Sequence, residues 1–363
     1  MEEKKKKSFF NTPSYQILPL VQPSLNGGLV NTLFIRRQCA EGLSESPDED
    51  RALAWLVLLG VYPRNAIDWP EIKHQIIQDY KGYVKDICHL EKWHTVFLRK
   101  HAGKKDLNVN DKELMFIIHN DISRTNRMIC FFPPRKPLPD DNSNDMYSPF
   151  IEHSRRLERI LYVFATVNHS LYYMQGFNEL LSPLYYALCK ATELFQNLDD
   201  VEALAFRCLQ ELLTATSLSQ FYTIQDQSSI LFHTLNRFNE LLAQKLPDVY
   251  TILKRLEIQP LMYSYRWFNI LFAHEHDLPN LLIVWDSLFA HIDDLIQYLF
   301  YVAIAHLRVI APLLDPNDSP NSLQVLHNMR IPNIYPILQD ASQSYDIDHG
   351  IVDKSKKYRY AAF

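Results

Sequence analysis

Three short patterns contain the residues of this chain whose types and spacing could support chemistry. They are Arg51 with Trp55, then Ile118, Asp121 and Arg124, and then Tyr173, Gln175 and Gly176. Arginine is permanently charged and binds phosphate oxygens, and a glutamine amide both donates and accepts hydrogen bonds. These residue types could therefore bind an anion and position a water molecule.

Each pattern taken alone also has a structural explanation. Trp55 fits the buried face of a helix. Asp121 and Arg124 lie three residues apart and could form a surface ion pair worth well under about 1 kcal/mol. Gln175 could be a buried amide bonded to a nearby carbonyl.

The stretch at 171–188, LYYMQGFNELLSPLYYAL, contains the third pattern. Most of it suits a buried helix, but Gln175, Gly176, Asn178 and Glu179 interrupt the apolar run. A glycine inside a helix costs about 1 kcal/mol relative to alanine. The interruption is therefore either a local bend with a satisfied amide, or a place where Gln175 acts outside the core.

The elements that must position these residues are predicted to be helices. Only 8 glycines occur in 363 residues, and apolar residues recur at spacings of three and four with no sustained alternation. We expect about a dozen helices and no strand. The segments with this pattern are 30–43, 50–63, 70–87, 111–126, 150–168, 200–215, 228–246, 263–279, 278–290 and 293–310.

Composition and motifs exclude several classes of function. The net charge of −5 gives no reason to expect nucleic-acid binding, and the five cysteines form neither a disulfide framework nor a zinc pattern. No phosphate-binding glycine loop or dinucleotide-binding motif is present. His274 and His276 are expected at a solvated helix end, and the arginines of SRRLERI (Arg155, Arg156 and Arg159) on an ordinary charged helix face. We expect no metal and no cofactor.

The chain's ends and one internal segment lack helical periodicity. Residues 1–29 are expected to form a flexible leader, and the segment 133–149, rich in Pro, Asp and Asn, a loop inserted into a helical domain. The apolar run at 295–305 is shorter than the roughly 20 residues that a membrane crossing needs. We therefore expect a cytoplasmic protein with no transmembrane segment.

Together and in this order, the three patterns resemble the R-x-x-x-W, I-x-x-D-x-x-R and Y-x-Q motifs of the TBC domain. This is an all-helical GTPase-activating domain that acts on Rab GTPases. Residues 265–289 also resemble the late helices of that family, with Trp267 in an R-W-F sequence and Trp285 and Asp286 in a W-D sequence. The resemblance implies an all-α domain of two helical lobes over residues 30–312. The polar and basic tail of the chain indicates a partly mobile extension at 313–363.

The resemblance also implies a mechanism and a partner. Arg124 and Gln175 would be catalytic residues supplied in trans to a GTP-bound Rab protein, which brings its own GTP and Mg²⁺. Arg124 would stabilise charge on the transferring phosphoryl group, and Gln175 would orient the attacking water. The residues expected to support them are Asp121, Tyr173, Gly176, Asn178 and, less directly, Arg51, whereas Trp55, Ile118, Trp267, Trp285 and Asp286 are structural.

One departure from the family pattern and two alternatives accompany this interpretation. No proline follows Arg124 before Pro133, so the loop after Arg124 is expected to differ in shape from that of many family members. One alternative is a non-catalytic TBC-fold scaffold that binds Rab or effector proteins, and another is an unrelated helical scaffold. A role in vesicle trafficking, peripheral association with endomembranes and the identity of the Rab stay open at this stage.

Overall fold

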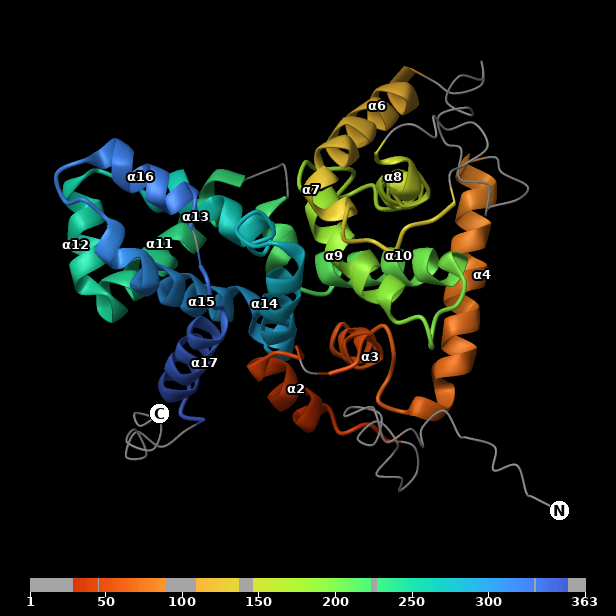
Figure 1. Ribbon diagram of the computed structural model, residues 1–363, viewed down its shortest axis with the longest axis horizontal. Coiled ribbons are helices and arrows are strands. Elements are labelled where there is room, and N and C mark those ends of the chain that lie inside the picture. The colour runs from red at the N-terminus through yellow and green to blue at the C-terminus, as the bar shows by residue number, and fades with distance from the viewer. Residues whose placement is uncertain are drawn as a thin grey trace. The chain divides into compact units, whose positions relative to one another are not determined.

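In the computed structural model of the chain (Figure 1), the described residues are 29–44, 46–88, 109–136, 146–222, 227–329 and 331–351. Nearly all the regular structure in these residues is helical. The strand-like pairing that occurs among them is an isolated bridge between Leu29 and Asn65. The predicted all-α fold class is confirmed.

The chain divides into two compact units. Among the described residues, unit 1 takes 29–37 and 43–222, and unit 2 takes 38–42 and 227–351. Helix α2 (Thr32–Glu41) runs across this division. The predicted leader up to residue 28, the central part of the predicted insertion (137–145) and the end of the chain (352–363) lie outside the described residues.

Helices α8 (Ile151–Val167), α9 (Phe177–Lys190) and α10 (Leu198–Thr214) form the centre of unit 1, and most of their residues are buried. Helix α10 packs against α4, α8 and α9, while α6 packs against α8 and α9, and α3 against α9. Nearly every residue of α9 is buried, because apolar side chains surround this helix on all sides. The elements of unit 1 after α2 are α3 (Asp48–Leu58), η1 (Ala66–Asp68), α4 (Trp69–Cys88), α6 (Val109–Arg124), α7 (Asn126–Ile129), η2 (Ser148–Phe150), α8 (Ile151–Val167), α9 (Phe177–Lys190), α10 (Leu198–Thr214) and η3 (Ser217–Phe221).

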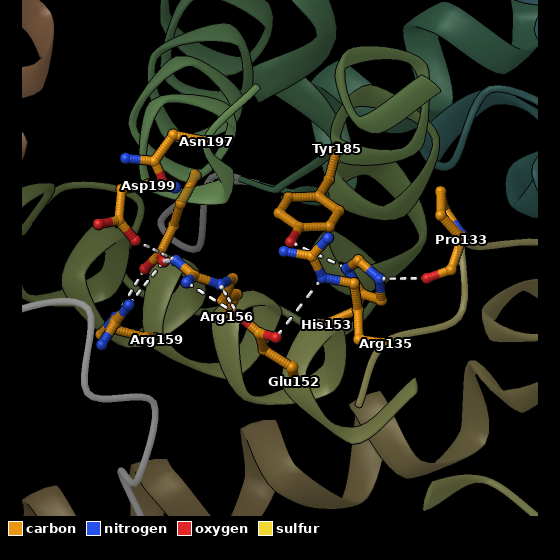
Figure 2. Close-up of polar contacts among 10 residues, drawn as sticks. Pro133, Arg135, Glu152, His153, Arg156, Arg159, Tyr185, Asn197 and Asp199 are labelled. Carbon is orange, nitrogen blue, oxygen red and sulfur yellow. Dashed lines mark hydrogen bonds and ion pairs between the residues drawn. The ribbon is translucent and has the colours of Figure 1, made fainter. Parts of the chain in front are cut away.

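The arginines of α8 do not form the ordinary charged face that the sequence predicted. Arg156 and Arg159 are buried, and Glu202 of α10 lies between them with no exposed surface. Arg159 donates two hydrogen bonds of 2.6 Å to the carboxylate of Glu202, and Arg156 donates one of 2.7 Å. Figure 2 shows Arg156 among Arg159, Glu152 and Asp199. The prediction was wrong because helical spacing cannot show that a carboxylate from another helix meets these arginines.

This buried cluster joins three helices of unit 1. Tyr80 of α4 donates a 2.7 Å hydrogen bond to the same carboxylate of Glu202. Burial opposes the charged form of Glu202, but the charges and hydrogen bonds of Arg159, Arg156 and Tyr80 outweigh it, so the pKa of Glu202 is lowered. Glu202 therefore stays ionised and holds α4, α8 and α10 together.

Unit 2 surrounds the apolar helix α15 (Leu295–Ile310), which packs against α11, α13, α14 and α17. Two of its helices, α16 and α17, fall in the predicted extension beyond residue 312. The other elements are α11 (Gln227–Lys245), α12 (Pro247–Arg255), α13 (Pro260–Asn269), α14 (Leu278–Ala290), η4 (Ile292–Asp294), η5 (Ala311–Leu313), α16 (Ser319–His327) and α17 (Tyr335–Asp348).

The continuous apolar segment Ile292–Leu313 is long enough to cross a membrane by length and composition. However, 67% of its most apolar window is buried inside the protein, and core helices of soluble proteins pass the same test. One such helix is weak support for a membrane span, and the packing of α15 in unit 2 accounts for its composition.

Unit 2 corrects two predictions from the sequence. The helix expected over 263–279 ends at Asn269, because Leu271 and Phe272 take left-handed backbone conformations with φ of 50° and 61°. His276 is not solvated as predicted but buried, and its Nε2 lies 2.9 Å from Nε2 of His306. The buried ring lies beside Phe272 and His306, which helical periodicity could not show.

The hydrogen bonds of this histidine pair fix its protonation. Nδ1 of His306 lies 2.7 Å from the carbonyl oxygen of Val302, so Nδ1 carries the proton and donates it. In the neutral pair, Nε2 of His306 then accepts a hydrogen bond from the Nε2–H of His276. Burial lowers the pKa of His276 to about 4 and that of His306 to about 3, the latter also through the charge of His276.

Candidate functional site

Arg124 is the last residue of α6, and its side chain is 69% exposed. A cation suits this position because the end of a helix carries partial negative charge. Nη1 of Arg124 lies 3.5 Å from Oδ1 of Asp121, one turn earlier on the helix. The guanidinium is therefore oriented by one carboxylate and otherwise presented to solvent.

Asp121 is buried and connects α6 to the segment that carries Gln175. Its Oδ2 accepts a 2.8 Å hydrogen bond from the hydroxyl of Tyr173. Burial, followed by the charge of Asp121, raises the pKa of Tyr173 far above its ordinary value. The hydroxyl therefore remains a donor, and Tyr173 positions the carboxylate beside Arg124.

Gln175 lies in a turn bounded by two left-handed residues. Tyr172 has φ of 49° and Gly176 has φ of 105°, with Tyr173, Met174 and Gln175 between them. Gly176 caps α9 at its first turn, since its carbonyl accepts from the amides of Glu179 and Leu180. The turn predicted at Gln175 and Gly176 is thus present, and the side chain of Gln175 is exposed.

Asn178, in the first turn of α9, holds the end of α6. Its amide donates to Oγ1 of Thr125 at 3.0 Å and approaches the carbonyl of Asp121 at 3.4 Å. Thr125 in turn donates to the carbonyl of Asp121 at 3.1 Å. We call these four buried residues, Asp121, Thr125, Tyr173 and Asn178, the support network.

Thr125 was given no role in the sequence analysis, although it follows Arg124 directly. Its position at the end of α6, where the backbone carbonyls lack helical partners, was the signal that could have identified it. The support network thus joins the end of α6 to the turn before α9. It leaves the side chains of Arg124 and Gln175 at the surface while their backbones are anchored.

Arg124 is followed by the short helix α7, and the segment after α7 is anchored to α8. The carbonyl of Pro133 accepts a 2.9 Å hydrogen bond from Nε2 of His153, and Nδ1 of His153 accepts from the hydroxyl of Tyr185 at 3.1 Å (Figure 2). Burial lowers the pKa of His153 to about 4, so the ring is neutral and can make both bonds. Arg135 pairs with Glu152 at 3.7 Å in the same region.

The other predicted motif residues lie in the cores of the two units. In unit 1, Arg51 donates a 3.0 Å hydrogen bond to the carbonyl of Leu43, and Trp55 is buried on α3, which packs against α9. Ile118 is buried on α6. In unit 2, Trp285 donates to the carbonyl of Leu271 at 2.9 Å, Trp267 stacks on Phe272, and Asp286 is buried.

The candidate site consists of two exposed side chains, Arg124 and Gln175, above the buried support network. Within the described residues, no group of three or more His, Cys, Asp or Glu side chains is placed to hold a metal ion. A charged guanidinium and a neutral amide can bind an anion and a water, and both side chains are exposed. The arrangement therefore suits action on a molecule bound by a partner.

Comparison with known proteins gives the family. The family described as the Rab-GTPase-TBC domain matches residues 48–314, well over half of the chain. The chain belongs to the RabGAP-TBC family. Its fold is similar to the crystal structure of the Ypt/Rab-GAP domain of Gyp1p, with a TM-score of 0.67 and 19% identity over 92% of this chain and 99% of that one.

Among curated relatives, TBC1 domain family member 13 from Homo sapiens is 29% identical over 53% of this chain and 48% of its own length. TBC1 domain family member 5 from Mus musculus is 26% identical over 80% of this chain and 38% of its own length. The GTPase-activating protein GYP7 from Debaryomyces hansenii is 24% identical over 83% of this chain and 38% of its own. The RabGAP-TBC chain thus spans about half or less of the length of these relatives.

Proposed function

We propose that this protein accelerates GTP hydrolysis by a Rab-family small GTPase, with Arg124 and Gln175 acting in trans. The observation that carries the proposal is the support network, which joins the backbones of two exposed side chains through Tyr173, Asp121 and Asn178. Membership of the RabGAP-TBC family and the similarity to GYP7, a GTPase-activating protein, support the same activity.

Arg124 has the chemistry that stabilises phosphoryl transfer. Negative charge develops on the oxygens of the transferred group, and a planar, permanently charged guanidinium can bridge two of them. An arginine supplied in trans typically gains roughly 10³–10⁵ in kcat, or about 4–7 kcal/mol of transition-state stabilisation. Asp121 limits the directions in which the guanidinium can point, so less entropy is lost when it enters the partner's site.

Gln175 has the chemistry that positions water. Its amide can accept a hydrogen bond from the attacking water and donate one to a phosphate oxygen without ionising. The turn between Tyr172 and Gly176 leaves the side chain of Gln175 exposed. In this proposal Gln175 takes the place of the GTPase's own glutamine, and the partner supplies both GTP and Mg²⁺, so the protein needs no cofactor of its own.

The setting proposed for this activity is the cytoplasmic face of endomembranes, where hydrolysis by a Rab protein would regulate vesicle trafficking. The wild-type protein should be tested on a panel of purified, GTP-loaded Rab proteins, with turnover and capture measured in parallel. The proposal is supported if the wild-type protein accelerates hydrolysis by one or more Rabs and Arg124→Ala abolishes this acceleration. Capture without acceleration would instead favour a non-catalytic scaffold.

A further inference from the structure

We propose that Phe116 and Ile117 of α6 form a recognition surface that contacts the partner GTPase and contributes to the choice of partner. We call these two residues the α6 apolar pair. The inference rests on the proposed function, because it uses the requirement that Arg124 enters the partner's nucleotide site. It adds a binding surface to a site so far described only by its catalytic side chains.

The two faces of α6 are clearly separated. Leu114, Ile118 and Ile122 are buried at spacings of four residues and pack into unit 1. Phe116, on the side of α6 opposite this buried stripe, is 66% exposed, and Ile117, at the edge of the stripe, is 49% exposed. An amphipathic surface helix normally presents polar side chains there, so two adjacent large apolar residues need an explanation.

The α6 apolar pair lies on the same side of the helix as Arg124. Ile117 precedes Arg124 by seven residues, which is almost two full turns, so the two side chains leave the helix in nearly the same direction. At a rise of about 1.5 Å per residue, they are separated by about 10 Å along the helix axis. A partner that receives the guanidinium of Arg124 therefore approaches the face that carries Ile117.

An ordinary protein–protein interface is large enough to include both Arg124 and the α6 apolar pair. A stable protein–protein interface covers about 800 Å² on each partner, which corresponds to a disc with a radius of about 16 Å. The α6 apolar pair lies within this radius of Arg124. Phe116 and Ile117 are therefore placed to be buried in the complex, where well-packed apolar side chains supply much of the binding free energy.

The occupant that fits is the GTP-bound GTPase, at an apolar part of its surface next to the nucleotide. Arg124 would act mainly on the rate of hydrolysis, because it contacts charge that develops in the transition state. The α6 apolar pair would act mainly on affinity, because it touches only protein. The two kinds of residue should therefore separate in kinetics.

The test compares the double variant Phe116→Ser/Ile117→Ser with wild type and with Ile67→Ser. Ile67 is a matched control: it is 71% exposed in unit 1, on η1 just before α4, and the start of α4 lies far from α6 (Figure 1). Binding is measured with Rab proteins loaded with a non-hydrolysable GTP analogue, and turnover with GTP. Thermal melting checks that each variant is folded.

We expect the double variant to bind its Rab about 10-fold or more weakly, with kcat at saturation nearly unchanged and Ile67→Ser like wild type. Unchanged affinity in a folded double variant overturns the inference while leaving the proposed function intact. Loss of self-association by the variant, with unchanged Rab binding, would show that the pair contacts a second copy instead. If wild type neither binds nor activates any Rab, the inference and the proposed function fail together.

Discussion

The hydroxyl of Tyr173 bonds the carboxylate of Asp121 to the turn that carries Gln175. Tyr173→Phe removes a hydrogen bond to a charged carboxylate and should lower the free energy of unfolding by about 1.5–3 kcal/mol. Because Asp121 then holds Arg124 less firmly, we also expect kcat to fall more than KM changes. Chemical denaturation and Rab turnover measure the two effects.

Tyr172→Phe provides the control for this substitution. Tyr172 adjoins Tyr173 and has the same side chain, but its ring is 44% exposed. Removal of its hydroxyl should leave both the stability and kcat within error of wild type. If Tyr173→Phe behaves like Tyr172→Phe, the support network does not position the side chains of Arg124 and Gln175.

Single residues also show which features of the site the sequence could predict and which it could not. The resemblance to a known family identified Asp121, Tyr173 and Asn178 as supporting residues, but it could not give their bonds. The contact between Asn178 and Thr125 joins residues 53 positions apart and exists only in the folded chain. For the same reason the sequence predicts Arg156 and Arg159 as surface charges, since the partner carboxylate of Glu202 is more than 40 residues away.

Among the elements, the contact of α4, α8 and α10 depends on the buried carboxylate of Glu202. Glu202→Gln removes the negative charge and leaves two buried arginines without full compensation, so we expect a loss of about 3–5 kcal/mol in the free energy of unfolding. Urea denaturation of the full chain measures this loss. The expected cost is large because neither guanidinium can reach water.

Glu211→Gln is the matched control on the same helix. Glu211 pairs with Arg207 one turn earlier, and the side chain of Arg207 is 43% exposed. Such surface pairs contribute well under about 1 kcal/mol. The two substitutions are chemically identical and differ in burial. Equal losses from Glu202→Gln and Glu211→Gln would contradict the structural importance of the buried cluster.

Periodicity predicted most helices because their buried faces repeat every three or four residues. It could not predict the end of α13, where Leu271 and Phe272 adopt left-handed backbone conformations. Steric clashes make these conformations rare for residues other than glycine. Tertiary contacts stabilise them, including the bond from Trp285 to the carbonyl of Leu271. Periodicity did not predict α16 and α17, which pack against α13 and α15.

For the whole molecule, the buried pair of His276 and His306 in unit 2 predicts sensitivity to acid. Both histidines are neutral when folded, with pKa values lowered to about 4 and about 3 from an ordinary value of 6.5. Below pH 6.5 the unfolded chain takes up protons that the folded chain does not, so stability is lost as pH falls toward 4. Two histidines give a slope of about 3 kcal/mol per pH unit near pH 5.

Carboxylates also contribute to acid unfolding, so the test compares the pH dependence of the free energy of unfolding between wild type and a histidine variant. His306→Gln removes one titrating group and should reduce the slope by about 1.4 kcal/mol per pH unit. Denaturant unfolding between pH 4.5 and pH 7, followed by tryptophan fluorescence, measures it, and parallel curves for wild type and His306→Gln would contradict the assignment.

The central claim is that Arg124 and Gln175 together complete the catalytic site of another protein. Single-turnover hydrolysis by a responding Rab whose own catalytic glutamine has been replaced by alanine tests this claim most directly. We predict that wild type still accelerates hydrolysis by this Rab, that Arg124→Ala and Gln175→Ala abolish the acceleration, and that both variants retain binding. Failure of wild type on this Rab, or full activity of Gln175→Ala, would contradict the claim.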